Sequence, residues 1–221
     1  MSVTHDIQRV RHELVMRSPR VVRVQPLSPR MLRVTLAGPE LAGFHSPGFD
    51  DHVKLFFPDP SASDAAPIGR DYTPRRFRPD HNELDIDFVL HGHGPAASWA
   101  AQARPGQVLR IGGPRGSTLV PANFAVNLLL GDASALPAIA RRLEQLPEGV
   151  QALVAIDISD ATEQQALSSQ AQMQLQWLHG ESGSSGDRLV AAMQAWTLPP
   201  GDVFAWAAGE SGAIRLRISY Q

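Results

Sequence analysis

The chain has 221 residues, of which 43% are hydrophobic, and a formal net charge of −2, which suits one large globular domain or two small ones. It contains no cysteine, and this excludes disulfides, thiol nucleophiles, cysteine-ligated zinc and an iron–sulfur cluster held by the chain's own cysteines. The charge favours neither nucleic acid nor an acidic membrane, and without a signal-like start or a membrane-spanning run we expect a cytoplasmic protein.

The first half of the chain has the alternation and turn residues of an antiparallel β protein. Residues 9–17 permit either a short helix or an edge strand. The expected strands are 21–24, 31–36, 53–57, 72–78, 84–90 and 107–111, with a loop over 58–69 and a short helix from about Pro95 to Ala103. In the fifth strand Leu84, Ile86 and Phe88 share one face, and Asp87 lies on the other. Six such strands predict a small closed barrel.

The sequence pattern changes at about Pro121. Residues 126–130 form a continuous apolar run, which is typical of a parallel strand covered on both faces. The segments expected after it are helix 134–146, strand 152–156, a polar segment 160–170, strand 174–178, a Gly/Ser loop 180–186, helix 187–196 and strand 203–207. Alternating strands and helices predict parallel βαβ units. We therefore predict two domains, a β-barrel over 1–122 and an α/β domain over 123–221.

Two stretches of the barrel carry groups that suit a flavin dinucleotide. Near the fourth strand, Tyr72 offers a flat ring, Thr73 a hydroxyl for a flavin nitrogen and Arg70 a charge for a pyrophosphate. Residues 94–98, Gly-Pro-Ala-Ala-Ser, open the helix with backbone N–H groups and a hydroxyl that suit a phosphate. Taken singly, each stretch is better explained structurally, the first as a surface strand with a packed tyrosine and the second as an ordinary helix start after a glycine turn. Together they span a dinucleotide, so we expect FAD rather than FMN.

Two other stretches suggest binding sites with less specificity. Residues 131–137, Gly-Asp-Ala-Ser-Ala-Leu-Pro, follow the first parallel strand, where open α/β sheets bind nucleotides, but they lack the Gly-x-Gly-x-x-Gly pattern. His91 and His93 would share a strand face and could ligate a metal. No third ligand is evident, so we do not expect a metal site.

In this order the motifs resemble the siderophore-interacting protein family, flavin-dependent ferric-siderophore reductases that are related to ferredoxin–NADP reductases. The resemblance is carried by residues 32–38, 51–58, 70–77, 87–92, 94–100 and 113–117 of the barrel and by 131–139, 177–179 and 206–210 of the second domain. It therefore extends over most of the chain.

The resemblance implies non-covalent FAD, NADPH or NADH as electron donor, and a ferric siderophore as substrate. The residues implied to hold FAD are Arg70, Tyr72 and Thr73 at the ring and ribityl end, Asp87, Val89 and His91 along the cofactor, and Gly94, Ala96, Ala97 and Ser98 at the pyrophosphate. Those implied to face the nicotinamide nucleotide are Asp132, Ser134, Ala135, Ala208, Gly209 and Glu210. Gly180 follows Trp177-Leu178-His179 where many members have an arginine, which leaves contacts to a 2′-phosphate open.

The chemistry explains why such a protein needs a flavin. A hydride donor gives two electrons at once, whereas ferric iron accepts one, and ferrous iron binds hard oxygen ligands less well. Arg75, Arg76, Arg78 and His45 offer positive charge to an anionic ferric chelate, or they are solvated surface groups. Two alternatives stay open: a flavoprotein with another acceptor, and a non-enzymatic siderophore-binding protein. We expect a monomer or weak dimer, without nucleic-acid or membrane partners.

The carboxyl end departs from the family. The family continues beyond the segment around Glu210 through a helix and a closing segment, whereas this chain ends at Gln221, and residues 214–220 alternate with the period of a strand. We expect a truncated or frame-altered end, with a complete short variant as the alternative. On that expectation FAD binds well while reduction by NADH or NADPH is weak.

Overall fold

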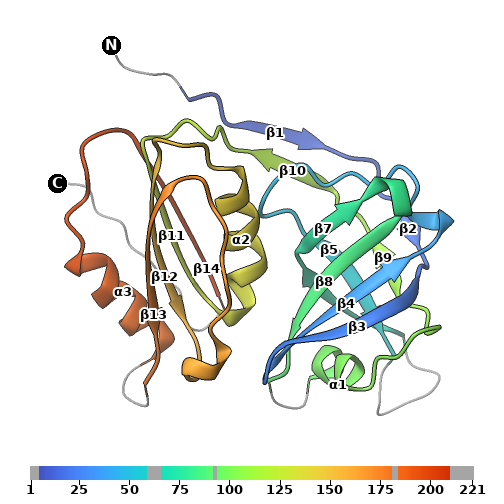
Figure 1. The fold of residues 1–221 in the computed structure, drawn as a ribbon. Helices are drawn as coiled ribbons and strands as arrows, with labels where there is room; N and C mark the ends of the chain where they lie inside the picture. The colour runs from blue at the N-terminus through green and yellow to red at the C-terminus, as the bar shows by residue number, and fades with distance from the viewer. Residues whose placement is uncertain (1–4, 59–65, 92–93, 181–183, 210–221) are drawn as a thin grey trace. The chain divides into compact units, whose positions relative to one another are not determined.

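The computed structural model describes residues 5–58, 66–91, 94–180 and 184–209 (Figure 1). The chain divides into two compact units, one of residues Ile7–Val120 and the other of Pro121 onward together with the residues before Ile7. Within the described ranges, no helix combines the length and the apolar character that a membrane crossing requires. Glu210 and the run 214–220 lie outside the described residues.

Antiparallel strands build the first unit. They are β1 (Gln8–Arg11), β2 (Met16–Arg17), β3 (Arg20–Ser28), β4 (Met31–Ala37), β5 (Val53–Phe57), β6 (Ile68–Tyr72), β7 (Pro74–Arg78), β8 (Glu83–Val89), β9 (Arg110–Gly112) and β10 (Gly116–Leu119). Two four-stranded sheets, in the orders β2-β9-β5-β6 and β3-β4-β8-β7, stand beside the pair β1-β10. The helical segments are η1 (Pro39–Leu41), η2 (Pro79–His81) and α1 (Pro95–Ala101). Of residues 9–17, the two ends lie in the short strands β1 and β2 and the middle is irregular, so the range is not a helix.

The two sheets join into the predicted barrel. On one side β6 leads into β7 through Thr73. On the other, Val21 N donates to Gln107 O at 2.8 Å and Leu109 N to Pro19 O at 3.0 Å, which connects β3 to the segment before β9. The predicted fold class is confirmed, but the expected single strand 72–78 is wrong, because the chain crosses from one sheet to the other at Thr73. Pro74, which has no N–H to donate, follows the crossing.

The barrel core is formed by the inward side chains of these strands. Among the fully buried ones are Val34, Leu36, Leu55, Phe57, Leu84, Ile86, Phe88 and Ile111. The alternation expected for the fifth strand is therefore present in β8. On the opposite face of β8, Asp85 and Asp87 are buried as well, because Arg78 and Arg33 neutralise them across the sheet.

The second unit is a parallel sheet with helices. Its strands are β11 (Val126–Asp132), β12 (Gln151–Asp157), β13 (Gln172–Leu178) and β14 (Val203–Ala208), in the order β13-β12-β11-β14. Its helices are α2 (Leu136–Gln145) and α3 (Ser185–Ala195), with short turns η3 (Ala133–Ala135) and η4 (Ala161–Glu163). Figure 1 shows α2 and α3 on opposite faces of the sheet. This arrangement confirms the predicted α/β fold.

A buried arginine stabilises the start of this unit. Arg142 of α2 is fully buried, and its guanidinium donates to Asn127 Oδ1 at 2.8 and 3.0 Å and to Pro121 O at 2.7 Å. Its charge also lies 5.2 Å from the centre of the Phe204 ring. Burial lowers the pKa of Arg142 to about 10, so the side chain is still charged at neutral pH. It thereby ties α2 to β11, to β14 and to the beginning of the unit.

Candidate functional site

The residues expected at the flavin ring lie where β6 ends. Arg70 is exposed, and its Nη1 donates to Gly69 O at 2.9 Å. Tyr72 is half-buried, with its ring centre 4.6 Å from that of Phe88. Burial, partly opposed by the charge of Arg70, raises the pKa of Tyr72 to about 12, so the phenol is neutral at physiological pH. Thr73 lies half-buried between β6 and β7.

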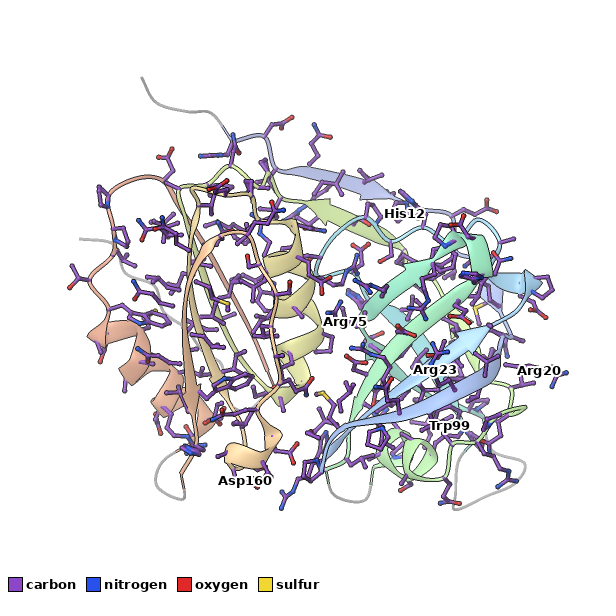
Figure 2. The ribbon with its side chains drawn as sticks, viewed as in Figure 1. His12, Arg20, Arg23, Arg75, Trp99 and Asp160 are labelled. Atoms are coloured by element: carbon purple, nitrogen blue, oxygen red, sulfur yellow. The ribbon has the colours of Figure 1, made fainter. Side chains whose placement is uncertain are left out.

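Aromatic rings connect this stretch to the helix that follows β8. Trp99 of α1 is labelled in Figure 2. Its ring centre lies 5.7 Å from that of Phe88 and 5.6 Å from that of Phe57. Phe57 in turn lies 6.3 Å from Tyr72. The four rings form one cluster inside the barrel. The structure therefore brings together the two stretches that the sequence predicted for the two ends of a flavin dinucleotide.

The start of α1 has the backbone groups that a phosphate needs. Gly94 is the N-cap and no side chain caps the helix, while Ser98 N donates to Gly94 O at 2.9 Å. The N–H groups of Ala96 and Ala97 therefore precede the first hydrogen bond within the helix. A Cβ placed on Gly94 would meet no atom within 4 Å, so this turn faces open space. Ala96 and Ala97 are buried and anchor it, and together these features fit a pyrophosphate.

Of the three residues expected along the cofactor, Asp87 and Val89 lie at the end of β8 and His91 lies two residues beyond it, with different surroundings. Asp87 is buried, and both of its oxygens accept from Arg33, at 2.7 and 2.8 Å. Val89 is half-buried and His91 is exposed. The Arg33 pair was not predicted, because it depends on the pairing of β4 with β8. His93 lies outside the described residues, among which no three His, Asp or Glu side chains gather as a metal site.

A hollow of about 270 Å³ on the outer face of the barrel was not predicted. Its lining residues are Leu14, Met16, His52, Lys54, Phe56, Asp71, Gly112 and Arg115. It lies outside the barrel because Val53, Leu55 and Phe57, which alternate with Lys54 and Phe56 along β5, are buried in the core. Lys54 Nζ is 2.8 Å from Asp71 Oδ1. The one sequence signal was that Lys54 is the only lysine of the chain.

The other basic residues considered from the sequence do not line this hollow. Arg78 donates to Asp85 at 2.7 and 2.8 Å and to Glu83 at 2.9 Å, so its charge is neutralised within the β7–β8 pair. Arg75 is half-buried and Arg76 exposed, and the His45 ring lies edge-on to His12 at 5.6 Å. Arg78 therefore has a structural role, and it is neither a free charge for the chelate nor the solvated surface group of the alternative.

The carboxyl ends of β11 and β14 bring together the described residues expected at the nicotinamide nucleotide, a set from which Glu210 is missing because it lies outside the described ranges. A Cβ on Gly131 would lie 2.4 Å from Ala135 Cβ and 2.8 Å from Ala208 O, so only glycine permits this close approach. Asp132 Oδ1 accepts from Ser134 N at 2.8 Å and caps η3. Gly209, half-buried, follows β14.

One ion pair at the same edge of the sheet was not predicted. Asp157 at the end of β12 accepts from Arg188 of α3 at 2.7 and 2.8 Å. The sequence pattern could not indicate this pair, because the two residues are 31 positions apart and meet only when α3 packs on β12.

Comparison with known proteins adds a family assignment. The model of the siderophore-interacting FAD-binding domain matches residues 20–66 and 60–118, and that of the siderophore-interacting protein family matches residues 124–218. The chain is 38% identical to the NADPH-dependent ferric-chelate reductase of Escherichia coli, over 94% of this chain and 87% of that protein. It is 33% identical to the ferric vibriobactin reductase of Vibrio cholerae, over 87% of this chain and 78% of that protein.

Solved structures agree with this assignment. A siderophore utilization protein from T. fusca superimposes with a TM-score of 0.87 at 37% identity, covering 96% of this chain and 87% of that one. A flavohemoglobin from Malassezia yamatoensis with bound FAD and heme has a TM-score of 0.64 at 10% identity, covering 93% of this chain and 55% of that one, and this likeness concerns the fold alone.

Proposed function

The chain belongs to the siderophore-interacting protein family, and from that premise we propose that it is an FAD-dependent ferric-siderophore reductase. It takes electrons from NADPH or NADH and releases ferrous iron from a ferric siderophore. When bound, FAD supplies the conversion between a two-electron donor and a one-electron acceptor. The chain's own residues bind and orient the reactants. We place the reaction in the cytoplasm, in intracellular iron acquisition.

The FAD site that we propose extends from the end of β6 to the start of α1. Tyr72 packs against the isoalloxazine, Thr73 hydrogen-bonds it, and Arg70 supplies charge. The N–H groups of Ala96 and Ala97, with Gly94 and Ser98, hold the pyrophosphate, and Asp87, Val89 and His91 line the cofactor. The aromatic cluster of Tyr72 and Trp99 supports this assignment, because it holds both ends of the site in one rigid core.

We assign the hollow on the outer face of the barrel to the ferric chelate. Lys54, Arg115 and, when protonated, His52 offer positive charge to an anionic chelate, and Leu14, Met16 and Phe56 offer apolar surface to its periphery. The Lys54–Asp71 pair is exposed on both sides, so it is screened by water and readily rearranges when an anion enters.

One observation carries the proposal more than any other. Asp71, which lines the hollow, stands in β6 between Arg70 and Tyr72 of the flavin motif. Neighbouring residues of a strand point to opposite faces, so the substrate hollow and the flavin motif share a single strand. Such proximity is what electron transfer requires, and it needs no acid–base residue.

At the nucleotide, we assign binding to the carboxyl ends of β11 and β14. Asp132, Ser134 and Ala135 lie at or after the end of β11, and Ala208 and Gly209 lie at the end of β14. Glu210, which we assign to the same site from the sequence, lies outside the described residues. The strands are all parallel, but successive strands are added on one side of β11 up to β13, and β14 is then added on its other side. Open α/β sheets bind ligands at the point where the order of strand addition reverses in this way.

The deciding experiment is anaerobic. The protein, purified with its cofactor, is reduced with NADH or NADPH and then mixed with ferric complexes of a triscatecholate, a trishydroxamate and citrate. We expect the flavin absorbance to bleach with a nucleotide and to return with at least one chelate, and the heat-released cofactor to be FAD by chromatography. A colourless protein that cannot be reconstituted with FAD would leave the siderophore-binding alternative. Bleaching without reoxidation by any chelate would leave the flavoprotein with another acceptor.

The substrate hollow is tested separately with charge variants. Lys54→Gln and Arg115→Gln remove positive charge from the hollow, and Arg104→Gln removes it from an exposed position outside it. We expect the first two to raise the KM for the ferric chelate while FAD content stays constant, and Arg104→Gln to change neither. An equal effect of all three variants would show that only the net charge of the protein matters.

A further inference from the structure

A chain of side-chain hydrogen bonds runs beside the hollow, through residues to which the reaction assigns no part. Ser117 Oγ donates to Asp51 Oδ2 at 2.7 Å, and His12 Nε2 lies 2.8 Å from Ser117 Oγ (Figure 2 shows His12). Because the single hydroxyl proton of Ser117 goes to Asp51, His12 Nε2 carries a proton and donates it. Asp51 and Ser117 are buried, and His12 is half-buried.

Asp51 is held through one oxygen. Its Oδ2 accepts from Ser117, from Ser46 Oγ at 3.0 Å and from Gly48 N at 3.0 Å. Its Oδ1 is buried and has no hydrogen-bond partner in the described part of the chain. An arrangement that leaves a buried carboxylate oxygen unpaired lowers stability. The arrangement instead fixes the orientation of the Asp51 carboxylate, because three donors converge on its Oδ2 atom.

Each member of the chain stands next to a wall of the hollow. In the sequence, His12 comes two positions before Leu14 and four before Met16, Asp51 directly precedes His52, and Ser117 comes two positions after Arg115. Backbone hydrogen bonds already join the first and third of these segments, since β1 pairs with β10 and His12 N donates to Arg115 O at 2.9 Å. The second segment leads into β5, which is paired with β9 at Lys54 and Gly112, and Asp51 adds a side-chain link from the residue before His52 to Ser117 and, through it, to His12.

We propose that His12, Ser117 and Asp51 are positioning residues that hold the three walls of the substrate hollow in register. They act through His52, Arg115 and Leu14 and do not touch the substrate. The inference rests on the proposed function, because it assigns the hollow to the ferric chelate. Loosening the chain of hydrogen bonds then weakens binding of the chelate and leaves the flavin site, which lies on the other face of β6, as it was.

The test measures binding of a redox-inert probe, the gallium(III) complex of whichever chelator gives the lowest KM with iron. Ser117→Ala removes the side-chain link between the segments and leaves their backbone pairing in place. Ser46→Ala is the matched control, because it removes another hydroxyl from the same Asp51 oxygen but has no wall residue beside it. We expect Ser117→Ala to raise the Kd of the gallium complex roughly three- to tenfold, the effect of one lost hydrogen bond. We expect Ser46→Ala to leave this Kd unchanged.

A conservative exchange distinguishes positioning from folding. His12→Ala should raise the Kd like Ser117→Ala, and His12→Gln should restore much of the affinity, because glutamine carries an N–H donor at a reach similar to Nε2. FAD content and the rate of flavin reduction by NADH or NADPH should be equal in all variants, including Ser117→Ala, which removes a single oxygen atom and keeps the fold.

The outcomes separate the inference from its premise. Equal Kd values for Ser117→Ala, Ser46→Ala and the natural chain, or no recovery in His12→Gln, would overturn the inference alone. A natural chain that reoxidises with no chelate and binds no gallium complex would remove the proposed function, and the inference with it.

Discussion

Neighbouring side chains of β6 belong to two different proposed sites, one on each face of the strand. Tyr72 packs into the aromatic core, Asp71 lines the outer hollow, and Arg70 is exposed. The residue types of β6 only weakly reveal which of its faces is covered, because Arg70 stands between Ile68 and Tyr72 on the face that turns to the core. The pairing of β6 with β5, Tyr72 opposite Val53 and Asp71 opposite Lys54, decides it.

The two arginines near this strand should have separable effects. Arg70→Ala removes the charge that we assign to FAD, and a charge-assisted contact is typically worth about 1.5–3 kcal/mol, so flavin affinity should fall about tenfold or more. Arg115→Ala, in the hollow, should leave flavin occupancy nearly unchanged. The ratio of flavin to protein absorbance after gel filtration measures both. Equal occupancy in Arg70→Ala and the natural chain would refute the assignment of Arg70.

Tyr72 should resist ionisation. Burial, opposed in part by Arg70, raises its pKa to about 12. Because the folded pKa exceeds the unfolded value of 10.0, the contribution of Tyr72 to the free energy of unfolding is complete below pH 10 and disappears as the pH rises through about 12. An absorbance titration at the tyrosinate band should show a component near pH 12 that Tyr72→Phe lacks. If Tyr72→Phe instead removes a component that titrates near the ordinary value of 10.0, the ring of Tyr72 is solvated.

Among the strands, the sheet β3-β4-β8-β7 depends on charges that face each other across it. Thr35 of β4 donates to Asp85 of β8 at 2.7 Å, and Arg78 of β7 binds both oxygens of Asp85 at 2.7 and 2.8 Å. Burial by itself would raise the pKa of Asp85, but hydrogen bonds from Arg78 and Thr35, with the charges of Arg78 and Arg33, outweigh it and hold the pKa below its usual range.

Acid should therefore weaken this sheet. A lowered folded pKa stabilises the protein above the unfolded value near 4, and that contribution disappears as the pH falls through the folded pKa. Asp85→Asn should lower the free energy of unfolding at pH 7 by about 1–3 kcal/mol and flatten its decline below pH 4. Urea unfolding at a series of pH values measures this. Asp80→Asn, at an exposed position of η2, is the control and should keep the acid-dependent decline.

For the molecule as a whole, the two units bind different reactants. We propose that the barrel binds FAD and the chelate and that the parallel-sheet unit binds the nucleotide.

Among the described residues, several exposed large apolar side chains fall in one segment, namely Ile7, Val10, Leu14, Val15 and Met16. Such a segment is short for a stable interface. Static light scattering should therefore give the mass of a monomer at low micromolar concentration, with at most weak dimerisation as concentration rises. A constant dimer mass on dilution would contradict this expectation.

Local sequence patterns determined the two-domain architecture, the barrel and the parallel sheet, because alternation with period 2 and continuous apolar runs depend only on neighbouring residues. They also indicated Arg70 to Thr73 and Gly94 to Ser98, since a ring next to a charge and a glycine before a helix are local signals. The split of the fourth strand at Thr73 was missed, because a barrel corner depends on which sheet each half joins.

The tertiary structure alone decided the remaining features. The pairing of Asp87 with Arg33 and of Asp157 with Arg188, the burial of Arg142 and the assembly of the hollow from residues 14 to 115 all join positions far apart in the chain. Strand register and helix packing bring these positions together, and register is set by the balance of all cross-strand contacts at once. A single sequence therefore shows which groups are present for flavin chemistry, but not which of them meet.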